Sequence, residues 1–134
     1  MKLGSIHQII QFNTTAERVY EMVMDERIHS KFTESLVTMS REIKGEFLVF
    51  DGYCTGYNRE LIPGEKIVQA WHFEEDGWPQ GHFSECTFIF KNTGQNCQLD
   101  FKQTGIPEHK VEALTEGWKS YYWEPMKSYL DSEY

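Results

Sequence analysis

The sequence has few positive charges for its length. Its 134 residues include 13 Lys or Arg against 21 Asp or Glu, which gives a formal net charge of −8 at pH 7. Proteins that bind nucleic-acid phosphates or anionic membrane surfaces use clusters of basic side chains, and this sequence contains no such cluster. We therefore expect neither nucleic acid nor a membrane among its partners.

Cysteine is also scarce. The three cysteines, Cys54, Cys86 and Cys97, are an odd number and include no Cys-x-x-Cys pair. Such a set does not make a disulfide framework, and free cysteines in strands are usually buried. The cysteine content therefore indicates a reducing compartment.

Long apolar runs are missing as well. The first residues, Met1 to Gln8, lack an apolar stretch long enough for a signal peptide, and no segment reaches the length of a transmembrane span. Together with the free cysteines, this pattern predicts a cytoplasmic protein, which we expect to be a monomer.

The common motifs of catalysis and metal binding are absent. The five histidines are scattered, without the helical or hairpin spacing of a zinc site. The glycines form no phosphate-binding loop, and there is no Gly-x-Ser-x-Gly or Cys–His signature. We therefore expect no catalytic residue, no metal ion and no cofactor, and a binding protein rather than an enzyme.

The composition that remains indicates a folded domain rich in aromatic residues. Apolar residues make up 40% of the chain and aromatic residues 15%, which excludes a disordered chain. A chain of this length buries roughly two-thirds of its unfolded surface on folding. Because no repeat, linker or low-complexity segment interrupts it, we expect a single domain over residues 1–134.

Periodicity and turn signals predict one strand, two short helices, a series of antiparallel strands and a long final helix. Asn13-Thr14-Thr15 is a helix-start signal, and Asp51-Gly52 and Pro63-Gly64 mark turns between strands. The expected strands are residues 5–12, 36–41, 46–50, 54–62, 65–73, 82–90 and 96–103, and the final helix runs over residues 107–130.

The final helix carries a broad apolar stripe. Pro107 suits its first turn, where a backbone N–H is not needed. Trp123 falls outside the stripe, so we expect it to be exposed at the edge, and Pro125 should kink the helix because it removes a hydrogen bond. Steps of three and four residues relate the members of the stripe, which are Val111, Leu114, Trp118, Tyr121, Tyr122, Pro125, Met126 and Tyr129.

This order of elements predicts an α+β helix-grip fold. A curved antiparallel sheet of about six to seven strands would wrap around the long C-terminal helix, with the two short helices after the first strand. The space between sheet and helix is either packed core or a ligand cavity, and Gln69 and Ser84 would bond to neighbours there or anchor a ligand. The candidate cavity-lining residues are Gln69, Trp71, Phe73, Ser84, Phe88, Trp118, Tyr121 and Tyr122.

A second group of residues is a candidate for contact with a partner. The acidic run Glu74-Glu75-Asp76 is most simply a solvated hairpin tip. Trp78, which follows it, either packs under the loop or touches a partner, because tryptophan is both highly buried on average and enriched at interaction hot spots. The candidate partner contacts are Trp78, Pro79, His82 and Trp123.

Several motifs in the chain resemble a known family. Trp78-Pro79-Gln80-Gly81-His82-Phe83, Gly105-Ile106-Pro107 and Gly117-Trp118 followed by Tyr121-Tyr122 together look like the C-terminal domain of the activators of the heat-shock protein 90 (Hsp90) ATPase. The resemblance runs over residues 5–130. It implies a helix-grip fold of the START and birch-pollen-allergen-like superfamily, a cytosolic co-chaperone role and no cofactor.

The resemblance also implies a partner. In the full-length activators, this domain contacts the ATP-binding domains of Hsp90 and favours their closed, dimerised state, whereas a separate N-terminal domain docks on the middle segment of the chaperone. This sequence shows no counterpart of that N-terminal domain. We expect a module that binds Hsp90 and stimulates its ATPase. The alternative is a carrier or sensor of a small apolar ligand held between the sheet and the helix.

Overall fold

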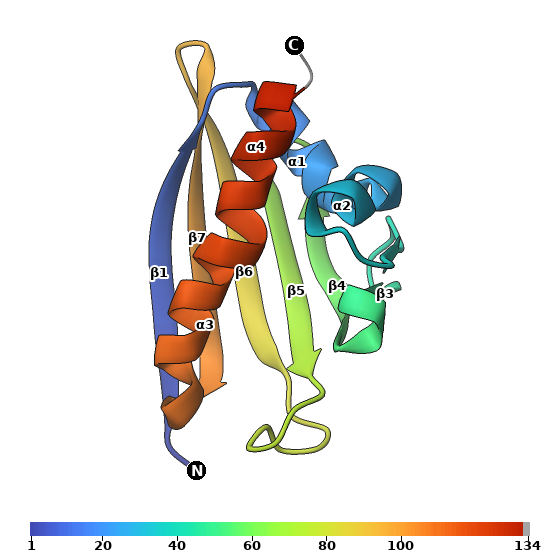
Figure 1. Cartoon of the computed structure of the whole chain (residues 1–134), viewed down its shortest axis with the longest axis vertical. Helices are drawn as coiled ribbons and strands as arrows, with labels where there is room; N and C mark the ends of the chain where they lie inside the picture. Colours follow the sequence, from blue (N-terminus) through green and yellow to red (C-terminus); the bar gives the residue numbers. More distant parts are fainter. Residues whose placement is uncertain (133–134) are drawn as a thin grey trace.

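The computed structural model describes residues 1–132 and has the α+β helix-grip architecture (Figure 1). Seven antiparallel strands form one sheet in the order β1-β7-β6-β5-β4-β3-β2. The C-terminal helical segment lies across one face of this sheet, and the two short helices lie beside its upper half (Figure 1). The strands are β1 (Leu3–Phe12), β2 (Thr38–Met39), β3 (Glu46–Val49), β4 (Cys54–Ile62), β5 (Lys66–Phe73), β6 (Ser84–Thr93) and β7 (Asn96–Pro107).

The inner face of the sheet follows the alternation of the sequence. On β6, buried and more exposed positions alternate, as expected from a period of two residues, whereas β5 is buried on both faces from Ile67 to Phe73. β1 pairs with β7, with Ile10 opposite Leu99 and Phe12 opposite Cys97. The first strand therefore forms one edge of the sheet, next to the last strand. This register brings a strand from each end of the chain into one core.

Two short helices follow β1. α1 (Ala16–Met24) begins after Thr15, whose hydroxyl oxygen accepts a hydrogen bond from the backbone N–H of Arg18. α2 (Glu26–Thr33) begins after Asp25, whose carboxylate accepts from two backbone N–H groups of the first turn. These caps satisfy helix-end donors and place the apolar faces of both helices toward the core.

The C-terminal segment is not one regular helix. A short 3₁₀ turn, η2 (Glu108–Lys110), leads into α3 (Val111–Trp118), and then a π-helical turn, η3 (Lys119–Trp123), leads into α4 (Glu124–Ser132). Pro107 does not open the helix as expected. It has the extended ψ of 126° and is the last residue of β7, where it lies opposite Leu3.

The π-helical turn ends two residues before Pro125. Pro125 has no N–H, and the N–H of Glu124 donates to the carbonyl of Lys119, five residues earlier. The expected irregularity is therefore present, as a widened turn. Within residues 1–132, no helix combines the length and the apolar character needed to cross a bilayer.

The widened turn corrects two expectations about aromatic side chains. A turn with bonds over five residues advances each residue by a smaller angle than the roughly 100° of an α-helix. The residues after Trp118 are therefore rotated relative to a regular stripe. Tyr121 points outward and is 62% exposed, whereas Trp123 points inward and is 4% exposed. Trp123 was expected at the exposed edge, and that expectation is wrong.

Candidate functional site

A small pocket lies where the C-terminal helix covers the end of the sheet. Its volume is about 80 Å³, which is well below the roughly 150 Å³ of an engineered protein cavity that holds benzene. The candidate cavity residues Trp71, Phe73, Trp118, Tyr121 and Tyr122 line it. Gln69, Ser84 and Phe88 do not. The remaining lining residues are Phe50, Tyr53, Cys54, Leu114 and Gly117.

Side chains fill the rest of the space between sheet and helix. The ring of Trp118 is central, with centroid distances of 4.4 Å to Phe101, 4.8 Å to Tyr122 and 5.2 Å to Trp71. The ring of Phe88 packs against the same cluster, with its centroid 5.0 Å from that of Phe101. This interior is a packed aromatic core, which is the simpler of the two expectations.

The polar residues of the inner face bond to their neighbours. Gln69 accepts a hydrogen bond from Trp71 Nε1 at 2.9 Å and donates to Asn58 Oδ1 at 3.0 Å. The hydroxyl of Ser84 donates to the carbonyl of Trp71 at 3.1 Å and accepts from Gln103 Nε2 at 2.9 Å. Among residues 1–132, no buried side-chain nitrogen or oxygen lacks a partner, so none is left to anchor a ligand there.

Two glutamines that were not among the predicted site residues hold the helix to the sheet. Gln103 Oε1 accepts from Trp118 Nε1, and Gln8 Oε1 accepts from Trp123 Nε1, both at 2.7 Å. Buried indole N–H groups need such acceptors. Gln103 shares the inward alternation of Phe101 on β7, and this pattern could have identified it.

Three aromatic side chains surround the mouth of the pocket. We call Phe50, Tyr53 and Tyr121 the aromatic rim. Phe50 is partly buried, Tyr53 and Tyr121 are exposed, and the ring centroids of Phe50 and Tyr121 are 5.9 Å apart. Tyr121, a predicted cavity-lining residue, does line the pocket, but from the exposed side.

The turn that carries Phe50 has an unusual backbone. Phe50 and Asp51 have φ values of 54° and 57°. Positive φ is a genuine outlier for a bulky residue such as phenylalanine. The β3–β4 turn therefore holds the Phe50 ring at the pocket in a conformation that few phenylalanines adopt.

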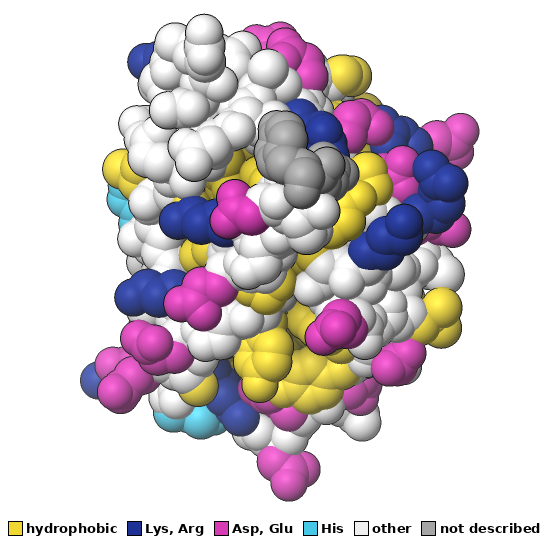
Figure 2. Space-filling view, turned by 45° about the horizontal axis from the view of Figure 1, so that its top comes forward, with side chains coloured by type: hydrophobic (Ala, Val, Ile, Leu, Met, Phe, Trp, Pro, Cys, Tyr) yellow, Lys and Arg dark blue, Asp and Glu magenta, His cyan; other side chains and the backbone are white. Residues whose placement is uncertain are grey.

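Acidic side chains lie next to the rim. Asp51 is exposed beside Phe50, and the hydroxyl of Tyr53 donates to the carboxylate of Glu75. Glu75 is paired with Lys110 at 3.1 Å, whereas Asp51 forms no ion pair with another of the residues 1–132. Hydrophobic side chains gather beside the C-terminal helix on the face shown in Figure 2, with Asp and Glu side chains around them.

Trp78 packs under its own loop. Its side chain is 5% exposed, its ring centroid is 4.8 Å from that of Phe73, and its Nε1 donates to the carbonyl of His82 at 2.8 Å. Pro79 and His82 are partly buried. Of the two interpretations that the sequence left open for Trp78, packing describes its geometry.

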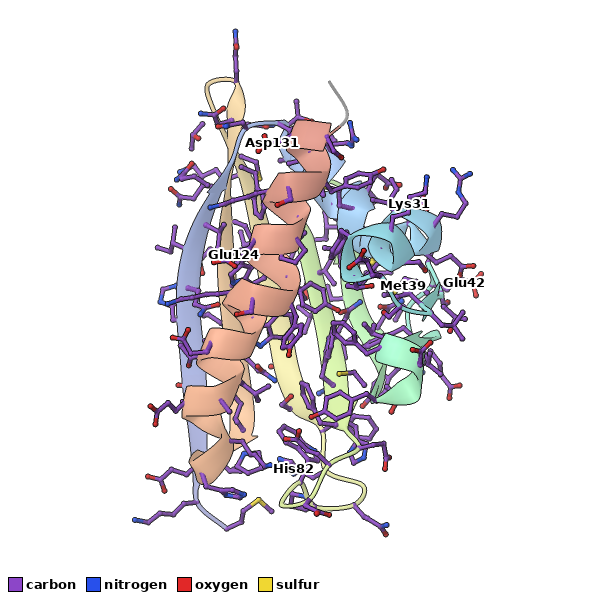
Figure 3. The ribbon with its side chains drawn as sticks, in the orientation of Figure 1. Lys31, Met39, Glu42, His82, Glu124 and Asp131 are labelled. Carbon is purple, nitrogen blue, oxygen red and sulfur yellow. The ribbon has the colours of Figure 1, made fainter. Side chains whose placement is uncertain are left out.

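His82 joins two of the motifs that carry the family resemblance. Its Nε2 lies 2.7 Å from the carbonyl oxygen of Gly105, to which it donates, and it lies in the β5–β6 loop at the lower end of the molecule (Figure 3). The Trp78–Phe83 motif and the Gly105–Pro107 motif therefore meet in space. Their contacts fix the loop on the end of β7.

We expect Trp78→Ala to destabilise the protein by about 3 kcal/mol, because it removes a buried indole and leaves a cavity against Phe73. The melting temperature should fall by on the order of 10 °C, measured by thermal unfolding monitored by circular dichroism. Gln80→Ala, an exposed position in the same loop, is the control. A melting temperature equal to that of the control would contradict the packing role of Trp78 and favour a surface contact instead.

A buried histidine connects α2 to the π-helical turn. His29 Nδ1 donates to the carbonyl of Val23 at 2.9 Å, and Nε2 accepts from the hydroxyl of Tyr122 at 2.8 Å. Burial lowers the pKa of His29 to about 4, so the ring is neutral at neutral pH. Burial also raises the pKa of Tyr122.

Two of the buried cysteines have perturbed pKa values. Burial raises the pKa of the Cys54 and Cys86 thiols, which keeps them protonated and unreactive at neutral pH. Over residues 1–132, no three His, Cys, Asp or Glu side chains are grouped so that they could hold a metal ion.

The sequence model of the family described as "Activator of Hsp90 ATPase homolog 1-like protein" matches residues 13–131. The chain belongs to this family. It is 31% identical over 116 residues to "Activator of 90 kDa heat shock protein ATPase homolog 1" of Homo sapiens, which is 87% of this chain and 34% of that protein. It is 34% identical over 110 residues to the homologue of Dictyostelium discoideum, and this match covers 81% of this chain and 28% of that protein. The chain thus spans about a third of the length of these relatives.

Solved structures show the same fold. A crystal structure of an HSP90 activator from Plasmodium falciparum superposes with a TM-score of 0.87 at 20% identity, covering 95% of this chain and 96% of that one. A crystal structure of a protein from Mesorhizobium loti superposes with a TM-score of 0.82 at 13% identity, covering 96% of this chain and 98% of that one. These similarities confirm the expected helix-grip fold.

Proposed function

We propose that this chain is a co-chaperone-like module that binds Hsp90 and stimulates its ATPase. The observation that carries the proposal is the family match over residues 13–131, together with 31% identity to a human activator of the 90 kDa heat-shock protein ATPase. The filled interior and the absence of a reactive group among the described residues are consistent with a regulator that acts through its surface. It works in the cytoplasm, as a single domain and as a monomer.

Stimulation of this kind requires unequal affinity for two states of the chaperone. A protein that binds open and closed forms equally shifts no population, however tightly it binds. The module therefore binds the ATP-binding domains of Hsp90 more tightly in their closed, dimerised state. The chain spans about a third of the length of its relatives, and the proposal concerns the contact that this domain makes.

The alternative, a carrier of a small apolar ligand, has less support. A carrier must enclose most of the surface of its ligand. The pocket holds about 80 Å³, and the buried glutamines and Ser84 beyond it are already bonded to neighbours.

Turnover of ATP by Hsp90 tests the proposal directly. We expect the rate to rise and saturate as this protein is added, and an inhibitor of the chaperone's ATP site to abolish the added turnover. A pull-down with the chaperone measures binding independently of the rate. The proposal is wrong if this protein, at high micromolar concentration, neither binds the chaperone nor changes its rate of ATP turnover.

A further inference from the structure

The aromatic rim differs from the exposed apolar side chains that stand singly on this protein. Single exposed residues such as Ile9 and Ile43 are normal on a soluble protein surface. Phe50, Tyr53 and Tyr121 instead come from two distant segments of the chain and converge on one pocket. Phe73 and Leu114 form part of its lining, so the rim opens onto an apolar floor.

Two irregular backbone segments create this convergence. The β3–β4 turn holds Phe50 and Asp51 at positive φ, and the π-helical turn over Lys119–Trp123 directs Tyr121 outward while Tyr122 and Trp123 are buried. Both π-turns and strained backbone are enriched at functional sites. They arise independently in the sequence, yet both deliver an aromatic ring to the same pocket mouth.

The charge beside the rim indicates the chemistry of what it binds. Asp51 is exposed next to Phe50, and its Oδ1 accepts a hydrogen bond from the backbone N–H of Leu36 at 3.1 Å, which holds the carboxylate in place. The neighbouring Glu75 and Lys110 compensate each other. The formal charge of the whole chain is −8. The negative charge beside the rim and on the chain as a whole favours a partner surface that carries Lys or Arg.

We propose that the aromatic rim docks a protein segment that inserts one apolar side chain into the pocket, with Lys or Arg flanking it near Asp51. The small volume suits a side chain better than a free ligand, and exposed aromatic residues around a pocket are typical anchors of interfaces. In assigning this segment to Hsp90, the inference rests on the proposed function.

Three variants test the surface. Tyr121→Ala removes an exposed ring and should leave the fold intact. Asp51→Asn removes the charge, while asparagine tolerates positive φ and its amide oxygen can still accept from Leu36. Phe83→Ala is the matched control, because Phe83 is an exposed aromatic residue that packs on Tyr57, away from the rim.

Binding of each variant to Hsp90 is measured by isothermal titration calorimetry at two salt concentrations. We expect Tyr121→Ala to weaken binding at least about tenfold, as truncation of an aromatic anchor does. Asp51→Asn should reduce the salt dependence, and Phe83→Ala should stay within about twofold of the original protein, as at positions outside an interface hot spot. If the original protein binds and Tyr121→Ala binds equally well, the inference is wrong and the proposed function stands.

A second arm separates this inference from the proposed function. The probe is a short peptide with one phenylalanine between lysines, and the control peptide has glutamates in place of the lysines. NMR titration should shift the amide signals of Phe50, Leu114 and Tyr121 with the first peptide only, and Tyr121→Ala should abolish the shifts. If the lysine peptide binds and Hsp90 does not, the proposed function fails and the docking surface stands. Absence of shifts at the rim with the lysine peptide overturns the docking surface.

Discussion

Trp118→Ala should lower the free energy of unfolding by about 3–5 kcal/mol, the cost of truncating a buried large aromatic residue. Trp118 contacts Phe101, Tyr122, Trp71 and Trp123, with ring centroids 4.4 to 5.5 Å away. It thus joins the helix to the sheet at the centre of the core. Urea unfolding at neutral pH measures the change, and an unchanged m-value would show that the loss reflects stability alone.

Two further measurements separate the causes of this effect. Trp118→Phe keeps a ring but removes the N–H that donates to Gln103 Oε1, so it should cost less, about 1–3 kcal/mol for the unsatisfied buried acceptor. In Trp118→Ala, the cavity adjoins the existing pocket, and added indole should raise the melting temperature by binding the folded state. A loss below about 1 kcal/mol for Trp118→Ala would contradict the packing of this core.

The sequence was sufficient for the architecture because its turn signals are local. Asp51-Gly52 and Pro63-Gly64 bracket β4, and the expected bounds of residues 54–62 are those observed. The inward positions of β6 also follow from alternation alone, because one face of that strand is buried and the other is more exposed. Local chemistry determined these features, so local reasoning could find them.

Features that depend on distant contacts could not be read in the same way. β7 was expected to end near Gln103 but continues to Pro107, because Leu3 and Gly4 at the start of the chain pair with its last residues. Trp78 was left undecided because the groups that bury it, the Phe73 ring and the His82 carbonyl, meet it only after the loop folds back.

Tyr121 is exposed and Trp123 is buried, the reverse of what the apolar stripe predicts, and this difference has another cause. A periodic stripe assumes a constant angle per residue, and the π-helical turn breaks that assumption for one turn. Pro125 was the available signal, since it predicted an irregularity at this place. It did not specify that the turn would widen, and so the sequence could not show which aromatic residue would be exposed at the pocket mouth.

Acid should destabilise this protein through His29. The pKa of His29 is lowered to about 4 in the folded state, against 6.5 for an ordinary histidine, because the ring is buried. As pH falls below 6.5, the unfolded chain therefore binds a proton that the folded chain does not. The free energy of unfolding should drop by about 3 kcal/mol between pH 7 and pH 4 from this residue alone, with no contribution from it above pH 7.

A matched variant isolates this contribution from that of the carboxylates. His29→Gln retains a donor for the Val23 carbonyl and an acceptor for the Tyr122 hydroxyl, but it cannot be protonated. It will lower stability at pH 7 through imperfect packing, so the informative quantity is the slope of the unfolding free energy against pH. The variant should lose less stability than the original protein between pH 6.5 and pH 4. Parallel curves would mean that His29 is protonated in the fold, and that its bond to the π-helical turn does not depend on a neutral ring.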